Sequence, residues 1–181
     1  MTTPAANGRK AVFWPLAILI ILVAALGFGL THVSRDLQSP LIGKSAPAFR
    51  LPVLGDTAIY TEGNLKGRPL LVNFFASWCA GCQVEHPFLM KLAREQNIEI
   101  VGMDYKDSTA DITAWLSQHG NPYRTVVMDE RGTAGLDWGV YGVPESYVLD
   151  AQGIIVYKHV GALTEDVWRN KIAPLLVSAP R

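Results

Sequence analysis

Two cysteines three positions apart are the residues of this 181-residue chain best suited to chemistry. Cys79 and Cys82 are its only cysteines, and a disulfide between residues so close adds little stability because it closes almost no loop. Both follow an apolar run, 70–75, and Cys79 stands where a helix should begin. Unpaired N–H groups and the positive end of the helix dipole lower the pKa of a thiol there. Because thiol–disulfide exchange needs a thiolate, the spacing predicts Cys79 as the attacking thiol and Cys82, one turn deeper, as the resolving thiol.

Two other interpretations of the cysteine pair are weaker. His86 follows Cys82 by one helical turn and could add a third metal ligand, but no fourth ligand is evident and Pro87 perturbs the helix. Two inert core cysteines would not explain Trp78, which would present a flat apolar surface beside a reactive sulfur. We therefore expect a redox-active Cys79–Cys82 disulfide, no metal and no other cofactor, with His86 at the surface or supporting the site. The P-x-x-x-T-x-x-C arrangement of thiol peroxidases is absent around Cys79.

Alternating strand-like and helix-like patterns predict an α/β domain that positions the pair. The run 70–75 is almost continuously apolar, as in a central strand covered on both faces. Asp107-Ser108 is suited to cap a helix that Gly120 ends. No internal repeat or low-complexity linker interrupts 46–177, which indicates one domain. The expected strands are 48–54, 58–60, 70–75, 98–103, 124–128, 145–149 and 154–159, and the expected helices are 79–96, 108–120, 131–138 and 166–177.

An uncharged apolar segment near the N-terminus predicts a membrane anchor. No charged residue lies between Lys10 and His32, and a helix over 11–31 is long enough to cross about 30 Å of hydrocarbon. Pro15 lies near its start, where a proline costs a helix least. A cleaved signal peptide would have a shorter apolar region of about 7–15 residues and a small-residue cleavage site. A buried core helix would need neighbouring elements on all its faces.

The charges beside the anchor predict its orientation. Arg9 and Lys10 precede the span, whereas Arg35 beyond it is offset by Asp36, and positive flanks stay in the cytoplasm. In a bacterium the rest of the chain would then lie in the periplasm. The 16 acidic and 16 basic residues cancel, and no basic stripe indicates nucleic-acid binding. The predicted organisation is a cytoplasmic tail, 1–10, a transmembrane anchor, 11–31, a tether, 32–45, and a periplasmic domain, 46–181.

Three features around the cysteines resemble the thioredoxin superfamily. They are the apolar strand, the Trp-Cys-x-x-Cys sequence at 78–82, and Pro87, five residues after the second cysteine. The later Gly-Val-Pro sequence at 142–144 resembles the cis-proline loop of that superfamily. The resemblance implies a cis Val143–Pro144 bond, against about 5–6% for an average X-Pro bond. It also implies that this loop faces the cysteines and pairs through its backbone with an incoming peptide.

Further segments match one narrower family. These segments are 43–47, 85–86, 102–107, 120–123, 135–142 and 144–145. They are similar to the thiol:disulfide interchange proteins of cytochrome c maturation, the CcmG/DsbE family. The resemblance covers nearly all of 41–172 and implies a thioredoxin-like fold with an N-terminal β-hairpin extension and a central strand–helix insertion, here 98–120. It also implies an inner-membrane tether and a periplasmic domain that reduces apocytochrome c or a thiol protein of cytochrome assembly. Its electrons would come from an inner-membrane thiol transporter.

Two positions depart from the usual pattern of that family. The dipeptide between the cysteines is Ala80-Gly81, where the family commonly has a proline, and Gly81 weakens the first helical turn. Val143 stands before Pro144, where the family more often has a smaller residue, and this resembles the oxidising DsbA branch. A general periplasmic disulfide oxidoreductase with another client or an oxidising direction is therefore the alternative.

Carboxylates near the cysteines are candidates for proton transfer. Thioredoxins usually place a buried Asp six residues before the first cysteine, whereas this chain has Asn73, which cannot transfer a proton. Glu85, about one turn beyond Cys82, and Glu145, just after the cis-proline loop, are the candidate replacements. A partly buried carboxyl near Cys82 would have a raised pKa and could accept the proton of that thiol. Solvated carboxylates are the alternative for both glutamates, and Asp104 is expected to be structural.

Overall fold

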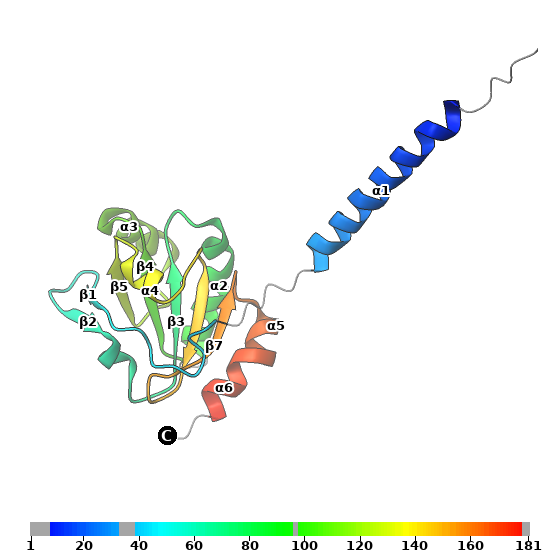
Figure 1. Ribbon diagram of the computed structural model, residues 1–181. Coiled ribbons are helices and arrows are strands. Elements are labelled where there is room, and N and C mark those ends of the chain that lie inside the picture. The colour runs from blue at the N-terminus through cyan, green and yellow to red at the C-terminus, as the bar shows by residue number, and fades with distance from the viewer. Residues whose placement is uncertain (1–7, 33–38, 96–97, 179–181) are drawn as a thin grey trace, which may run out of the picture. The chain divides into compact units, whose positions relative to one another are not determined.

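The structure, a computed structural model, describes residues 8–32, 39–95 and 98–178 (Figure 1). The chain divides into two compact units, 1–37 and 38–181. The first contains one helix, and the second contains the sheet and the cysteine pair.

The helix of the first unit, α1, spans Gly8–His32 and contains Pro15. Its side chains are described for 14–28. No helix within the described part of the chain is long and apolar enough to cross a membrane. The predicted anchor, 11–31, extends beyond the described side chains, and the predicted cytoplasmic tail and tether lie partly outside the described residues.

A five-stranded sheet forms the centre of the second unit (Figure 1). Its middle strand, β3 (Leu70–Phe75), has every residue buried. It pairs in parallel with β4 (Ile100–Tyr105), which pairs in parallel with β5 (Thr125–Asp129). On its other side β3 pairs antiparallel with β6 (Glu145–Leu149), which pairs antiparallel with β7 (Ile155–Val160). The predicted central strand is confirmed, and its coverage on both faces explains its apolar sequence.

A hairpin extends this sheet beyond β5. Strand β1 (Arg50–Pro52) pairs antiparallel with β2 (Ile59–Thr61), which confirms the predicted N-terminal hairpin. Gly55 in the turn has a φ of 74°, in the left-handed region that favours glycine. The Leu54 N–H donates to the Val126 carbonyl at 2.9 Å, so the hairpin is joined to the edge of β5.

Two longer helices cover one face of the sheet. The helices α2 (Ala80–Glu95) and α3 (Thr109–His119) pack there on apolar side chains of β3, β4 and β5. The predicted caps of α3 are confirmed, because the Ser108 hydroxyl accepts from its first turn and Gly120 ends it. Strand β4 and helix α3 fill the predicted insertion, 98–120, and β4 lies inside the sheet between β5 and β3.

Shorter elements cover the opposite face of the sheet. The 3-10 turn η1 (Glu62–Leu65) and helix α4 (Thr133–Asp137) pack there. Trp138 is fully buried among them, with its ring centroid 5.4 Å from that of Phe74 and 5.1 Å from that of Tyr147. The two faces thus have separate cores, called here the α2-side core and the Trp138-side core.

The predicted last helix contains a π-helical turn that we did not expect. Helix α5 (Glu165–Val167), the turn η2 (Trp168–Ile172) and helix α6 (Ala173–Ser178) follow one another. Pro174 has no backbone N–H, so the regular bond to the carbonyl four residues earlier cannot form. The widened turn before it satisfies the backbone differently, with a bond between residues five apart.

Candidate redox site

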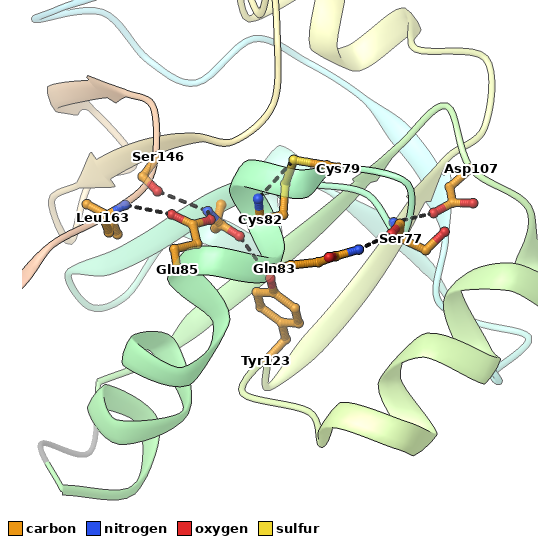
Figure 2. The surroundings of a disulfide bond; sticks show 10 residues. Ser77, Cys79, Cys82, Gln83, Glu85, Asp107, Tyr123, Ser146 and Leu163 are labelled. Carbon is orange, nitrogen blue, oxygen red and sulfur yellow. Dashed lines mark hydrogen bonds between the residues drawn. A yellow bond between two sulfur atoms is a disulfide. The ribbon is translucent and has the colours of Figure 1, made fainter.

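The two cysteines form a disulfide at the N-terminus of α2 (Figure 2). Their Cα atoms are 5.2 Å apart, and both residues are buried. The Cys82 N–H donates to Cys79 Sγ at 3.0 Å. The sulfur of Cys79 therefore already faces a backbone donor of the first helical turn, which would stabilise a thiolate once the disulfide is reduced.

The segment between β3 and α2 is held by the segment between β4 and α3. The Ser77 N–H donates to Asp107 Oδ2 at 2.6 Å (Figure 2), and the Trp78 indole N–H donates to the Lys106 carbonyl at 3.1 Å. Lys106 adopts a positive φ of 53° at this bend. The insertion thus fixes Trp78 directly before the disulfide, with 58% of this residue exposed as an apolar surface.

The cis-proline loop packs against the turn that carries the disulfide. The Val143–Pro144 bond is cis, which confirms the implication of the thioredoxin resemblance. A Cβ atom on Gly81 would lie 2.9 Å from Pro144 Cδ, closer than carbon atoms of side chains normally approach. The glycine between the cysteines therefore lets the proline ring approach α2 at the site.

Glu85 is buried beneath α2 and hydrogen bonded through both carboxylate oxygens. Only 1% of the residue is exposed, so the alternative of a solvated carboxylate is wrong for it. Asn73 Nδ2 donates to Oε1 at 3.0 Å. The Leu163 N–H donates to Oε2 at 2.8 Å, as Figure 2 shows. Burial raises the pKa of Glu85 to about 7, although these hydrogen bonds act to lower it. Since Glu85 follows Cys82 by three residues in α2, a carboxyl that titrates near neutral pH neighbours the second cysteine.

Two residues that our sequence analysis missed complete this polar cluster. The Tyr123 hydroxyl donates to Asn73 Oδ1 at 2.9 Å, and Asn73 Nδ2 donates to Ser146 Oγ at 3.0 Å. Burial and then the nearby carboxyls of Glu85 and Asp104 raise the pKa of Tyr123 well above its usual value, so its phenol remains a donor. These partners fix the Asn73 amide with its NH₂ group toward Glu85. We call Asn73, Glu85, Tyr123 and Ser146 the Glu85 cluster.

Glu145 is also buried but lies on the opposite face of the sheet. In β6 its side chain lies toward the Trp138-side core. Lys158 Nζ is 2.8 Å from its Oε2, the Tyr141 N–H donates to its Oε1 at 3.2 Å, and the Tyr147 hydroxyl donates to its Oε2 at 3.2 Å. The structure therefore does not bring Glu145 into the Glu85 cluster, and the solvated alternative is wrong here too.

Asp104 is a second buried acid on the face of the α2-side core. It lies beside Phe75 in the register of β4 and β3, and neither oxygen of its buried carboxyl has a hydrogen-bond partner among the described residues. Burial is the main cause that raises its pKa to about 8, and the nearby carboxyls of Asp107, Glu130 and Asp129 add to it. Burial therefore favours the protonated form of Asp104 to a higher pH than is usual for an aspartate, which the sequence pattern did not indicate.

His86 is buried between α2 and the end of α3, so a surface position is wrong. Its Nε2 lies 3.3 Å from the His119 carbonyl oxygen and 3.2 Å from that of Gly120, and its ring centroid lies 4.4 Å from that of Trp115. Burial lowers the pKa of His86. Among the described residues, no group of three or more His, Cys, Asp and Glu side chains could hold a metal ion.

Known proteins match this region closely. Residues 41–173 match the Redoxin family. The thiol:disulfide interchange protein DsbE of Pseudomonas aeruginosa is 48% identical over 168 residues, which cover 92% of this chain and 93% of that protein. DsbE of Escherichia coli K12 is 40% identical over 174 residues, which cover 92% of this chain and 94% of that protein.

A solved structure agrees with these sequence matches. A protein from Chlorobium tepidum assigned as a thiol:disulfide interchange protein DsbE superimposes with a TM-score of 0.64 at 27% identity, over 76% of this chain and 96% of that one. The matched region contains the disulfide, the buried carboxyl beside Cys82 and the cis-proline loop. The chain therefore belongs to the Redoxin family and, within it, to the CcmG/DsbE thiol:disulfide interchange proteins, and it is a thiol:disulfide oxidoreductase with a thioredoxin-like fold.

Proposed function

We propose that this oxidoreductase reduces disulfides during cytochrome c maturation. Its similarity to DsbE proteins over most of its length supports this client class. The observation that carries the direction of electron flow is Glu85, a buried carboxyl about one turn from Cys82. When Glu85 is ionised, its negative charge disfavours a second negative charge, that of a thiolate, on the nearby cysteine sulfur. Strong stabilisation of a thiolate favours the reduced pair and makes an oxidant, so this environment favours a reductant.

The proposed reaction begins from the reduced pair. The Cys79 thiolate attacks one sulfur of a client disulfide, and the other client sulfur leaves as a thiolate and takes up a proton. Cys82 then loses its proton to Glu85 and attacks the Cys79 sulfur, which breaks the mixed disulfide and releases the second client sulfur as a thiolate that takes up a proton. The client gains the two electrons that the dithiol loses when the Cys79–Cys82 disulfide forms.

The client side of the site is the apolar surface of Trp78 and the cis-proline loop. An extended client segment pairs with the backbone before Pro144, which itself has no N–H to donate. The proposed clients are the haem-binding cysteine pair of apocytochrome c and a thiol protein of cytochrome assembly. An inner-membrane thiol transporter returns electrons to the pair, and the Cys79–Cys82 disulfide is the redox group.

We further propose that the redox domain, 46–181, lies in the bacterial periplasm and that 11–31 anchors it in the inner membrane. The uncharged apolar stretch and the basic residues before it support this topology. The tail, 1–10, is then cytoplasmic, and 32–45 is the tether. Alkaline phosphatase fused to the C-terminus should be active, and carbonate should not extract the protein. A shortened soluble product would show a cleaved signal peptide instead.

One observation favours a second function. Val143, before the cis-proline, resembles the oxidising DsbA branch, which supports a general periplasmic oxidoreductase with an oxidising direction or another client. Two measurements separate the alternatives. For the reductase, the purified protein should have a potential well below the about −120 mV of DsbA. Cells without it should fail to mature c-type cytochromes, with partial rescue by an added thiol reductant. A potential near that of DsbA and normal cytochrome c in the deletion strain would leave the oxidising function.

A further inference from the structure

The segment 138–142, which precedes the cis-proline loop, is hydrogen bonded to side chains of strands β6 and β7. We call it the approach loop. Three of its backbone groups bond to side chains of β6 and β7. These bonds join the Trp138 carbonyl to the Tyr147 hydroxyl at 2.8 Å, the Gly139 carbonyl to Lys158 Nζ at 2.9 Å, and the Tyr141 N–H to Glu145 Oε1 at 3.2 Å.

Two of these side chains form a buried ion pair. Lys158 Nζ lies 2.8 Å from Glu145 Oε2, and the side chains are 6% and 0% exposed. Removing two charges from water has a free-energy cost that their attraction often does not recover, so stability alone does not account for such a pair. Each charged group also bonds the approach loop. Glu145 uses its other oxygen, Oε1, to accept from the Tyr141 N–H, and the Lys158 ammonium donates a further hydrogen to the Gly139 carbonyl.

Lys158 contacts the approach loop a second time. Its Nζ lies 5.0 Å from the ring centroid of Tyr141, close enough for a cation–π interaction. Tyr141 is 63% exposed and precedes Pro144 by three residues. Lys158 thus holds the loop through the Gly139 carbonyl, through the Tyr141 ring and, by fixing the Glu145 carboxylate, through the Tyr141 N–H.

We propose that Lys158 is a positioning residue for client binding. It does not contact the reacting sulfurs but fixes the approach loop, and with it the Val143–Pro144 backbone that pairs with the client. The partner chemistry is an extended peptide segment beside a disulfide. The inference rests on the proposed docking of clients at the cis-proline loop. A loop held in its binding geometry spares the client the ordering of that backbone, so Lys158 acts on client affinity more than on the chemical step.

The test compares two disulfide substrates of the full-length reduced protein. One is a model peptide with an internal disulfide and no cytochrome sequence, and the other is oxidised 2-mercaptoethanol, which has no backbone to pair. In Lys158→Met, which keeps the side-chain length but removes the charge, KM for the peptide should rise about tenfold while kcat changes less than about twofold. The rate constant with the small disulfide should change much less. Lys158→Arg keeps the charge and the donors and should restore most of the peptide affinity.

Lys91→Met is the matched control, because Lys91 lies on the exposed face of α2 and its nearest carboxylate, that of Glu165, is 3.8 Å away. Its KM should equal that of the parent. Should Lys158→Met fail to fold, Glu145→Gln/Lys158→Met removes both buried charges and should still show the raised KM. A folded single or double variant with the parental KM for the peptide would overturn the proposal. An equal fall in the rate constants for the peptide and for the small disulfide would overturn it too. A parent that shows no preference for the peptide over the small disulfide would instead contradict docking at the cis-proline loop.

Discussion

Two buried glutamates lie on opposite faces of the same sheet, and their partners differ. Glu85 is bonded to uncharged donors, the Asn73 amide and the Leu163 N–H, whereas Glu145 is paired with the Lys158 ammonium. Burial without a counter-charge raises the pKa of Glu85 to about 7, where a carboxyl can exchange protons. Both carboxyls are buried, so it is the partner, uncharged for Glu85 and an ammonium for Glu145, that distinguishes the two environments.

The separation of the two glutamates follows from the alternation of a β-strand. Asn73 and Phe74 are neighbours in β3, so their side chains point to opposite faces. Asn73 meets Glu85 from α2, and Phe74 is the register partner of Glu145 in β6. Adjacent residues of one strand therefore contact two different functional regions.

The largest expected effect is on turnover, and it concerns Cys82, the thiol whose proton Glu85 would accept. If Cys82 is the resolving thiol, Cys82→Ser should lower turnover by about a thousandfold or more and should trap clients as mixed disulfides through Cys79. Cys79→Ser should lose turnover equally but trap almost none. Non-reducing electrophoresis of client complexes measures both. Trapping by Cys79→Ser alone would reverse the two roles and place Glu85 beside the attacking sulfur.

The next effect distinguishes the glutamates by stability. Glu145→Gln leaves the Lys158 ammonium buried without its counter-charge, so the free energy of unfolding at neutral pH should fall by about 3 kcal/mol. Glu85→Gln breaks no ion pair, but it replaces one of two accepting oxygens by an NH₂ group, so the free energy of unfolding should fall by only about 1 kcal/mol. Urea denaturation measures both. Equal losses would show that the two carboxyls contribute to stability in the same way, against the difference in their partners.

Asp104 is a second buried acid on the Glu85 side of the sheet that has no ion-pair partner among the described residues. Its pKa in the folded protein, about 8, lies above the ordinary 3.8, so the unfolded chain binds fewer protons between these values. Burial of the protonated carboxyl costs little, so the free energy of unfolding is highest at acid pH. It falls as pH rises toward 8, because the buried carboxyl then has to ionise. Asp104→Asn should therefore be more stable than the parent above that pH by about 2 kcal/mol. Denaturation at two pH values tests this, and a constant difference between the proteins would contradict it.

A smaller effect concerns the chemistry itself. The rate of client reduction should show a step near neutral pH, because the pKa of Glu85 is about 7. Glu85→Gln should remove the step and lower the rate above it by about tenfold, whereas Glu145→Gln should keep the step. Stopped-flow rates with a disulfide peptide across neutral pH measure the profile. A step that persists in Glu85→Gln would assign it to another group.

The features predicted correctly from the sequence depend on short-range signals. The apolar run 70–75, the Ser108 cap and the turn at Gly55 each involve a few neighbouring residues. The expected strand 98–103 lies at Ile100–Tyr105 in the structure. The apolar pattern ends at Met103, but the strand continues through Asp104, a polar residue that is buried in the sheet.

The partners of the two glutamates could not be predicted in the same way. The hydrogen bond from Tyr123 to Asn73 joins residues 50 positions apart, and that from Leu163 to Glu85 joins residues 78 apart. Only the strand order brings them together. The face on which Glu145 lies depends on the register of β6 with β3, which the sequence of β6 alone does not contain. Pro174, by contrast, is a local signal for the break in the last helix.

The smallest expected effect tests how the Glu85 cluster is held. Tyr123→Phe removes the donor to Asn73 Oδ1, so the amide can turn and present that oxygen to Glu85. An oxygen there accepts from the protonated carboxyl, whereas the NH₂ group donates to the anion, so the pKa of Glu85 should rise further. The rate step should then move to higher pH by about half a unit.

Tyr147→Phe is the matched control, because it removes a buried hydroxyl on the Glu145 side that lies 2.8 Å from the Trp138 carbonyl oxygen and 3.2 Å from Glu145 Oε2. Both variants leave a buried acceptor with one donor fewer, and both should lower the free energy of unfolding by about 1 kcal/mol. Only Tyr123→Phe should move the step, because the sheet separates Tyr147 from Glu85. An equal shift in both variants would mean that the step reports general loosening of the sheet, and the division of the two carboxyls into separate regions would then fail.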